Sequence, residues 1–400
     1  MCLPNWAGDY ELKSLGLPAL FFVLESRFDI IRAYMIQPYH HTSRPHPKKF
    51  RKGENFKEFL NIYDLEIERV KEELGETKNQ RVGVEIPEGM KKFTHELAKY
   101  LEQMLGIEVF ISSDPCFGAC DIKYYQFNVF GINKIIHFGN VKIPNRKLPM
   151  GMKVIFVPLF IKMIDLKSAI SDAVSYLKEN KIKKVGLASS IQYIKNIEIA
   201  EKELTKEGIK VFVGKGDRRV KFRGQVLGCN VSSAANIKNK VEKFIMFENG
   251  NFHAKPISIV TKKDIICFDP FTKKRFLFFY NEIIREIFST KQRNNDPLKR
   301  VKKVAFLLSS KLGQSRIADV LRLKRMFESR NFSTVIVIAD YVNFDSVNNI
   351  DVDLIVSTVC PRVALDEREQ FKTPILSISE AEQFINNKVG NSSYVFDQTP

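Results

Sequence analysis

Arg81-Val-Gly-Val-Glu-Ile86 is a short apolar segment of the kind that forms a buried β-strand. A segment with apolar residues at spacings of three and four, Leu97–Leu105, follows it and predicts a helix. Two further strand-like segments, Ile107–Ile111 and Lys134–Phe138, complete the unit. Strands that alternate with helices of this length predict a parallel sheet with right-handed crossover connections.

The same order of segments occurs twice more along the chain. The second copy begins at Lys184-Val-Gly-Leu-Ala-Ser189 and the third at Lys303-Val-Ala-Phe-Leu-Leu308. Helices are expected at residues 197–204 and 317–327, and further strands at 209–213, 243–247, 334–338 and 352–357. Because the spacing from first to third strand is similar in all copies, the sequence predicts three similar α/β domains. Each is expected to be a small parallel sheet flanked by helices, and the three to surround a common centre.

The repeats also suggest where the domains begin and end. We expect domain 1 at residues 58–155, domain 2 at 156–285 and domain 3 at 286–400. The segment Asn281–Pro297 ends in a polar run, Lys291–Asp296, which is interpreted as a linker into domain 3. Residues 1–57 are rich in Pro, His and aromatic residues without a clear period, and are expected to form a disordered or loosely packed extension.

Composition narrows the class of protein. The 400 residues include 63 Lys and Arg against 46 Asp and Glu, a net charge of +17. The basic residues are spread along the chain without a nucleic-acid-binding motif, which favours a solvated surface over a direct nucleic-acid role. No apolar run is long enough to cross a bilayer, so the sequence predicts a cytoplasmic protein. Its six cysteines are too few to staple the fold, and are better read as metal ligands or reactive thiols.

Three cysteines lie where α/β sheets bind ligands, in the loops that lead from strands into helices. Cys120 follows the second strand of domain 1, Cys229 the second strand of domain 2, and Cys360 the third strand of domain 3. We call these the three loop cysteines. One thiolate from each domain suits a 4Fe–4S cluster, because three thiolates bind three irons and leave the fourth open to a substrate.

A free cysteine is more often a small buried hydrophobic residue than a ligand. Cys267, within the apolar segment Asp264–Asp269, is expected to be such a core residue. Cys116 forms a Cys-x-x-x-Cys pair with Cys120, but Lys123 stands where a radical-SAM CxxxCxxC motif would need a third cysteine. Cys116 is therefore not expected to bind iron.

The loops that carry these cysteines resemble those of the archaeal diphthamide synthase family, the 2-(3-amino-3-carboxypropyl)histidine synthases. The segments that carry the resemblance are Tyr63-Asp-Leu-Glu66, Pro115-Cys-Phe-Gly-Ala-Cys-Asp121, Gly224-Gln-Val-Leu-Gly-Cys229, Asn251-Phe-His253 and Ser357-Thr-Val-Cys-Pro-Arg362. In this family the cysteine that ends the first of the cysteine motifs binds iron, which corresponds to Cys120. Phe117 replaces the usual Tyr of that motif.

The resemblance implies a homodimer with a 4Fe–4S cluster and S-adenosylmethionine as co-substrate. The implied reaction is a noncanonical radical cleavage that transfers the 3-amino-3-carboxypropyl group to a histidine of translation elongation factor 2. It also implies an electron donor. The carboxylate of the co-substrate needs a cation or backbone donors, for which Arg362 is the first candidate. The other candidates for substrate binding are Gln225, His253, Gln192 and Gln314, each of which could instead support the cluster.

Two alternatives remain open on the sequence alone. A quinolinate-synthase-like dehydratase also uses three domains and three cysteines around one open iron, although the Gln-Val-Leu-Gly-Cys and Val-Cys-Pro-Arg loops argue against it. A non-catalytic iron–sulfur subunit, serving electron transfer or as a scaffold, would share the same fold.

Overall fold

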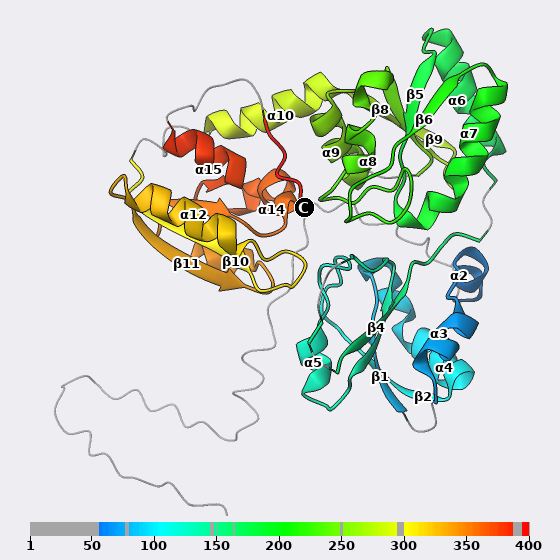
Figure 1. Cartoon of the computed structure of the whole chain (residues 1–400), viewed down its shortest axis with the longest axis horizontal. Helices are drawn as coiled ribbons and strands as arrows, with labels where there is room; N and C mark the ends of the chain where they lie inside the picture. Colours follow the sequence, from blue (N-terminus) through cyan, green and yellow to red (C-terminus); the bar gives the residue numbers. More distant parts are fainter. Residues whose placement is uncertain are drawn as a thin grey trace, which may run out of the picture. The chain divides into compact units, whose positions relative to one another are not determined.

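The computed structural model describes residues 56–76, 80–144, 148–149, 151–162, 165–248, 251–293, 300–386 and 394–399. The expected N-terminal extension lies outside the described residues, except for its last two, which open a helix. The prediction of three parallel-sheet domains flanked by helices is confirmed (Figure 1). No helix among the described residues is long and apolar enough to span a membrane.

Domain 1 has a four-stranded parallel sheet in the order β2-β1-β3-β4. Its strands are β1 (Gln80–Glu85), β2 (Ile107–Ile111), β3 (Lys134–Phe138) and β4 (Lys153–Val157). Its helices are α2 (Phe56–Ile62), α3 (Ile67–Leu74), α4 (Thr94–Leu105) and α5 (Tyr124–Asn128). The first strand lies inside the sheet because each crossover returns the chain beside it, as expected for this connection.

Domain 2 has a five-stranded sheet in the order β6-β5-β7-β8-β9. Its strands are β5 (Lys184–Leu187), β6 (Lys210–Val213), β7 (Lys243–Met246), β8 (Ile265–Asp269) and β9 (Lys274–Phe278). Its helices are α6 (Lys167–Glu179), α7 (Ile197–Lys206), α8 (Ser232–Ala235), α9 (Asn251–Thr261) and α10 (Tyr280–Arg293). The edge strand β9 is antiparallel to β8, since a tight turn joins the two.

Domain 3 repeats the plan of domain 1, with the order β11-β10-β12-β13. Its strands are β10 (Lys303–Ser309), β11 (Ser333–Ala339), β12 (Leu354–Ser357) and β13 (Ile375–Leu376). Its helices are α12 (Ile317–Glu328), α13 (Phe344–Asn348), α14 (Pro361–Asp366) and α15 (Ile378–Ile385). A capping box at Ser377 and Glu380 fixes the start of α15.

Each sheet buries both of its faces. In domain 3, Phe306 and Val356 pack toward α12 and α15, whereas Leu307 and Ile355 pack toward α13 and α14. Apolar side chains point alternately to the two faces of a strand, so a strand covered on both sides reads as a continuous apolar run. This is why the sequence segments 81–86, 184–189 and 303–308 carry almost no polar alternation. Cys267 lies in β8 and is fully buried, as expected of a core residue.

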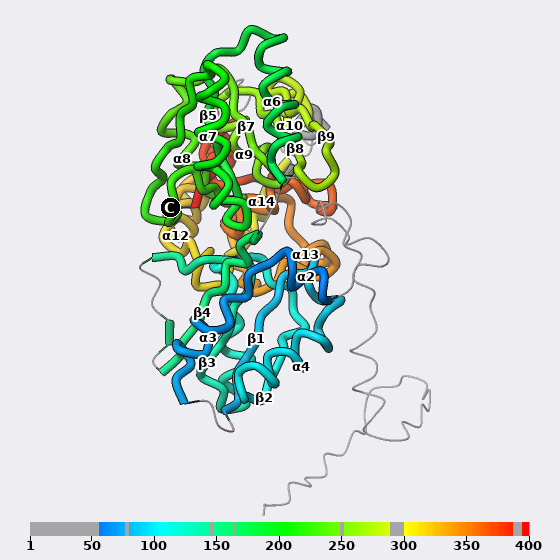
Figure 2. Tube along the Cα trace, turned by 90° about the vertical axis from the view of Figure 1, so that its right-hand side faces the viewer, coloured from blue at the N-terminus to red at the C-terminus, as the bar shows by residue number. Residues whose placement is uncertain are grey.

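The structure differs from the expected boundaries in three places. β4 ends at Val157 and pairs with β3, so the first sheet continues beyond residue 155. The expected linker at Lys291–Asp296 begins inside a helix, because α10 runs to Arg293; residues 294–296 lie outside the described part. The C-terminal segment Tyr394–Thr399 ends on domain 2, where the amide of Thr399 donates to the carbonyl of Cys229 (Figure 2).

Candidate functional site

The three loop cysteines lie after the carboxyl ends of parallel strands. Cys120 is in the connection from β2 to α5, and Cys229 in the connection from β6 to α8. Cys360 is the N-cap residue of α14, directly before Pro361, whose fixed φ suits the first turn of a helix. None of these three cysteines is in a disulfide, and all three residues are partly exposed. The fold therefore puts each sulfur at the edge of its sheet where ligands bind.

The thiols of Cys120 and Cys229 are electrostatic neighbours although they belong to different domains. Burial raises the pKa of the Cys120 thiol to about 11, and the second cause is the negative charge of Cys229. Two thiolates side by side repel each other, so they need a cation or a metal centre between them. The arrangement suits a shared metal centre better than two separate free thiols.

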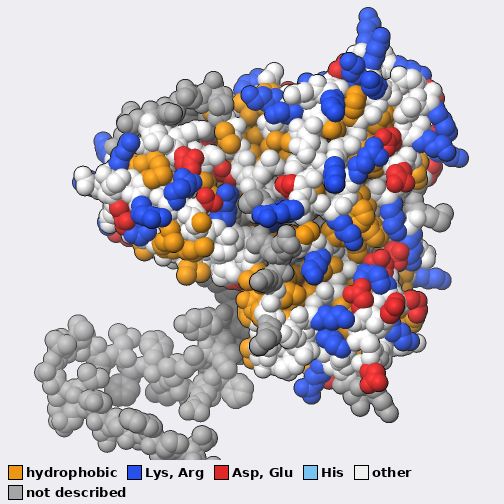
Figure 3. All heavy atoms as spheres, viewed as in Figure 1, with side chains coloured by type: hydrophobic (Ala, Val, Ile, Leu, Met, Phe, Trp, Pro, Cys, Tyr) orange, Lys and Arg blue, Asp and Glu red, His pale blue; other side chains and the backbone are white. Residues whose placement is uncertain are grey.

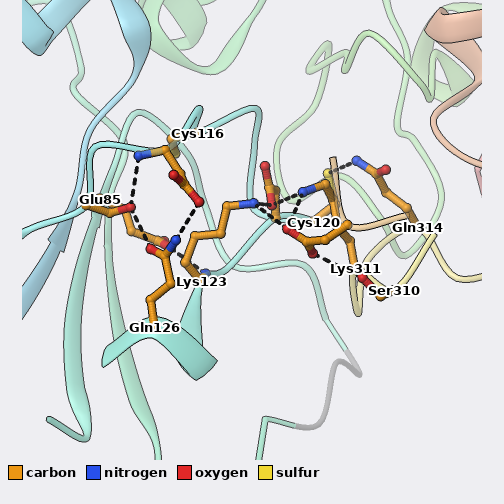
Figure 4. Close-up of polar contacts among 12 residues, drawn as sticks. Glu85, Cys116, Cys120, Lys123, Gln126, Ser310, Lys311 and Gln314 are labelled. Atoms are coloured by element: carbon orange, nitrogen blue, oxygen red, sulfur yellow. Dashed lines mark hydrogen bonds and ion pairs between the residues drawn. The ribbon is translucent and has the colours of Figure 1, made fainter. Parts of the chain in front are cut away.

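Domain 3 closes over the Cys120 loop at Gly313. The amide of Gly313 donates to the carbonyl of Cys120 over 3.1 Å. A Cβ at position 313 would lie 2.2 Å from both Cα and Cβ of Cys120, so only glycine fits this close approach. Next to it, the Nε2 of Gln314 donates to the Sγ of Cys120 over 3.3 Å (Figure 4). Gln314, a predicted substrate residue, thus contacts a predicted iron ligand.

Arg219 links domain 2 to the contact between Gly313 and Cys120. Its side chain is buried, and its Nη2 donates to the carbonyl of Gly313 over 3.0 Å. The positive charge of Arg219 also acts to lower the pKa of the Cys120 thiol, against the larger effect of burial. Arg219 was not among the residues predicted from the sequence. The Arg218-Arg219 pair in the loop after β6 was the available signal, but the surplus of basic residues along the chain concealed it.

The Cys229 loop is held by the end of the chain. The amide of Thr399 donates to the carbonyl of Cys229 over 2.9 Å, and the side chain of Asn230 donates to the carbonyl of Thr399 over 3.1 Å. On the other side, a Cβ at Gly228 would lie 2.1 Å from the ring of Phe252. The loop is therefore enclosed by the C-terminal segment and by α9, which fixes the direction of its sulfur.

Arg362 lies between the Cys229 and Cys360 loops. It is two residues after Cys360, and its guanidinium carbon stands 4.5 Å from the centre of the Phe252 ring. Its Nε forms an ion pair with Asp366 at 2.5 Å. The side chain is buried, and its Nη1 has no hydrogen-bond partner among the described residues. A buried guanidinium with an unused donor is costly unless a ligand satisfies it, so Arg362 suits an anionic ligand.

The other predicted substrate residues are placed differently. Gln225 is fully buried, and its Oε1 accepts from the amides of Lys221 and Phe222, while its Nε2 has no partner among the described residues. His253 is in α9, and its Nδ1 lies 3.1 Å from Glu248. Gln192 donates its Nε2 to the carbonyl of Gly139 over 2.7 Å, which joins domain 2 to domain 1. Of these three, Gln225 is the one with a buried side-chain nitrogen that has no partner among the described residues.

A buried ionic network joins domain 1 to domain 3 beside Cys120 (Figure 4). The Nζ atoms of Lys123 and Lys311 both lie 2.6 Å from the Oδ1 of Asp121, the residue after Cys120. Both lysines also reach Asp340, at 3.2 and 3.4 Å. Burial opposes the charge of Lys123, but Asp121 and Asp340 raise its pKa. Lys123, the position where a radical-SAM loop would carry a cysteine, thus has a structural role.

The donor set fits a cluster better than a single metal ion. Among the residues that the structure describes, no three His, Cys, Asp or Glu side chains are close enough to hold one ion. A tetrahedral ion with metal–sulfur bonds of about 2.3 Å needs its sulfur ligands only about 3.8 Å apart. A 4Fe–4S cluster binds each thiolate through a different iron, so its ligands stand farther apart and can come from separate loops.

Fold and site together define a class: a three-domain α/β protein with a thiolate site drawn from loops of different domains. The family model described as "putative diphthamide synthesis protein" matches residues 86–395. The chain belongs to this diphthamide synthesis family. That assignment decides against the quinolinate-synthase-like dehydratase.

Two archaeal relatives match most of the chain and almost their own full lengths. The 2-(3-amino-3-carboxypropyl)histidine synthase of Pyrococcus horikoshii is 29% identical over 343 residues, which are 84% of this chain and 94% of the relative. That of Methanocaldococcus jannaschii is 26% identical, over 86% of this chain and 95% of the relative. The crystal structure of Dph2 from Pyrococcus horikoshii with a 4Fe–4S cluster is 28% identical and covers 84% of this chain and 94% of its own, with a TM-score of 0.72.

Proposed function

We propose that this chain is a 4Fe–4S enzyme that transfers the 3-amino-3-carboxypropyl group of S-adenosylmethionine to a histidine of translation elongation factor 2. The three loop cysteines would bind the cluster. The observation that carries this proposal is that the domain 2 connection holding Cys229 reaches the Cys120 loop through Arg219 and Gly313, in a member of a family with a cluster-bearing solved structure. Cys360 supplies the third thiolate, since its loop adjoins Cys229 through Arg362 and Phe252.

When bound, the cluster would supply the electron that cleaves a carbon–sulfur bond of the sulfonium. The protein's part is to hold and tune the site. Gln314 donates a hydrogen bond to the Sγ of Cys120, and such bonds to the sulfurs tune the potential of a cluster. Arg219 adds a buried positive charge near the same thiol. The backbone contact between Gly313 and Cys120 keeps this loop from relaxing away.

Arg362 is the residue we propose for the carboxylate of S-adenosylmethionine. A charged hydrogen bond from its unused Nη1 would fix the aminocarboxypropyl end of the co-substrate beside the cysteine loops. Phe252 and Asp366 hold the guanidinium in place, so little side-chain entropy is lost on binding. The unused Nε2 of Gln225 offers a second polar contact in domain 2. This orientation puts the aminocarboxypropyl carbon, rather than the adenosyl carbon, toward the cluster.

The partners follow from the same assignment. We propose that elongation factor 2 is the protein substrate, that a separate electron donor reduces the cluster, and that the chain works as a cytoplasmic homodimer. On the face shown in Figure 3, Lys and Arg side chains are scattered among Asp and Glu, without one large basic patch.

Product analysis tests the proposal. Protein purified without oxygen and reduced with dithionite should convert S-adenosylmethionine to methylthioadenosine, with little 5′-deoxyadenosine. Mainly 5′-deoxyadenosine would refute the proposed orientation. A loaded cluster without any cleavage would instead support the non-catalytic alternative. Adding elongation factor 2 should then give a product heavier by one aminocarboxypropyl group on a single histidine.

A further inference from the structure

Cys116, which is not expected to bind iron, lies within hydrogen-bonding distance of a histidine side chain. It lies in the loop after β2, four residues before Cys120, and is partly exposed. Its Sγ is 3.9 Å from the Nε2 of His137, which lies in β3. A cysteine in contact with an imidazole is a recurring arrangement for a reactive thiol.

His137 is itself held by a carboxylate. Its ring is fully buried, and its Nδ1 is 2.5 Å from the Oε2 of Glu85 in the neighbouring strand β1. The other oxygen of Glu85 accepts the amide of Lys123, which fixes the carboxylate. The side chain of Asn140 lies 3.1 Å from the Nε2 of His137. An asparagine amide has both a donor and an acceptor, so it can partner this nitrogen in either protonation state.

Cys116, His137 and Glu85 thus stand in the order thiol, base and orienting carboxylate, as in a Cys–His–acid triad. Burial alone would keep His137 neutral, yet Cys116 and Glu85 raise its pKa to about 10. A protonated imidazole between a carboxylate and a sulfur stabilises the sulfur as a thiolate. The ionisable groups that face this sulfur and imidazole among the described residues are Cys116 in the loop, Glu85 from β1 and His137 from β3; Phe156 from β4 presents only its ring.

Cys267 shows what a structural cysteine looks like in the same chain. It is fully buried in β8. Burial, followed by the charges of Glu248 and Asp269, raises the pKa of its thiol well above the usual value. Cys116 differs in both respects, since it is partly exposed and contacts an imidazole instead of carboxylates.

We propose that Cys116 is a histidine-activated thiol that reacts with low-molecular-weight disulfides, and so is a redox modification site distinct from the iron ligands. The thiolate sulfur attacks one sulfur of the disulfide, a new sulfur–sulfur bond forms, and the old one breaks. Cys116 ends as a mixed disulfide with one half of the reagent, and the other half departs as a thiolate that takes the proton of the His137 imidazolium. One thiol and one disulfide are consumed, and one thiol and one disulfide are produced, so no other oxidant is needed.

The rate of disulfide exchange at Cys116 should exceed that of an ordinary thiol most clearly in mildly acidic solution. An ordinary cysteine with a pKa near 8.5 is only about 0.3% ionised at pH 6, whereas a thiolate held by imidazolium is largely ionised. The lower basicity of such a thiolate costs about tenfold in intrinsic reactivity. The net expectation is that Cys116 reacts about tenfold faster at pH 6 than an ordinary thiol.

The experiment uses the full chain with its cluster loaded and kept free of oxygen. It measures the rate of exchange of 2-hydroxyethyl disulfide at each cysteine, read by peptide mass spectrometry. Between about pH 6 and pH 8, the rate at Cys116 should change less than about threefold. In His137→Gln and in Glu85→Gln it should be about tenfold lower at pH 6 and should rise steeply with pH. Glu85→Gln keeps the size of the side chain and an acceptor for Lys123, so it is informative even if His137→Gln does not fold.

Two controls separate this inference from the proposed function. Cys116→Ser should lose the labelled peptide but keep cluster absorbance and S-adenosylmethionine cleavage; loss of the cluster would mean that Cys116 is an iron ligand and would overturn the inference. Cys267→Ala should leave the labelling of Cys116 unchanged. The inference would also be refuted if Cys116 showed the steep pH profile of an ordinary thiol and neither His137→Gln nor Glu85→Gln changed that profile. Exchange at Cys116 needs no S-adenosylmethionine, so it can succeed where the proposed transfer reaction fails.

Discussion

Replacing Arg362 by alanine removes the buried donor that we assign to the carboxylate of S-adenosylmethionine. The Nη1 atom has no partner among the described residues, so the substitution breaks no protein hydrogen bond at that atom. A hydrogen bond to a charged group is worth about 1.5–3 kcal/mol. Because each 1.36 kcal/mol is a factor of ten, kcat/KM for the cleavage of S-adenosylmethionine should fall by about 10- to 150-fold.

The same substitution also affects the protein itself. It removes the contact of the guanidinium with the Phe252 ring, which is worth about 0.5–2 kcal/mol, and it leaves Asp366 without its cation. Arg362→Lys keeps the charge but not the planar fork, and should recover part of the lost activity. Asp366→Asn breaks the ion pair and leaves the guanidinium in place, so it measures the structural contribution alone.

The assay is anaerobic production of methylthioadenosine at a series of S-adenosylmethionine concentrations, with cluster absorbance measured on each sample. We expect Arg362→Ala to raise KM while the cluster stays loaded, and Asp366→Asn to change KM much less. If Asp366→Asn lowers activity as much as Arg362→Ala, or if Arg362→Ala loses the cluster, Arg362 supports the Cys360 loop and does not bind the carboxylate.

Substituting any one of the three loop cysteines by alanine should remove most cluster absorbance, whereas Cys116→Ala and Cys267→Ala should retain it; full loading in a loop variant would refute the ligand assignment. Phe396→Ala should destabilise the protein by about 3 kcal/mol in urea unfolding and reduce cluster loading, because the buried C-terminal segment holds the Cys229 loop; unchanged loading would show that the loop holds itself. Burial acts to raise the pKa of Glu248, but His253 and Ser190 outweigh it and lower this pKa in the folded protein. The ionised carboxylate of Glu248 therefore stabilises the fold above about pH 4.3, and this contribution is lost as pH falls below that value. Glu248→Gln should therefore flatten the acid limb of the unfolding free energy, and an equally steep limb in this variant would contradict the assignment.

Much of the fold could be predicted because its strands are covered on both faces. Buried strands such as 304–308 are apolar throughout, and helices such as 317–327 present one apolar face, so both leave strong local patterns. The helix α10 was missed because its residues 280–293 are mostly polar, and a polar helix resembles a linker in composition. The antiparallel strand β9 was missed for a related reason, since Lys274 and Arg275 interrupt its apolar pattern.

Part of the candidate site could likewise be predicted from the sequence, and part of it could not. A cysteine in a strand-to-helix loop could be recognised locally, because parallel topology fixes where such loops lie. The partners that hold those cysteines could not, since Gln314 and Cys120 are 194 residues apart and meet only when domain 3 closes on domain 1. The same holds for Thr399 on Cys229 and for Arg219 on Gly313.

The sequence by itself determined the three repeated sheets and the positions of the loop cysteines, because periodicity and turn placement are properties of short segments. Only the tertiary structure decided that Cys116 faces His137 and Glu85, and that Lys123 is paired with Asp121 and Asp340 instead of standing free. Such pairings join separate strands or separate domains, and hydrogen bonds and charge pairs act through distances of a few ångströms, whatever the separation along the chain.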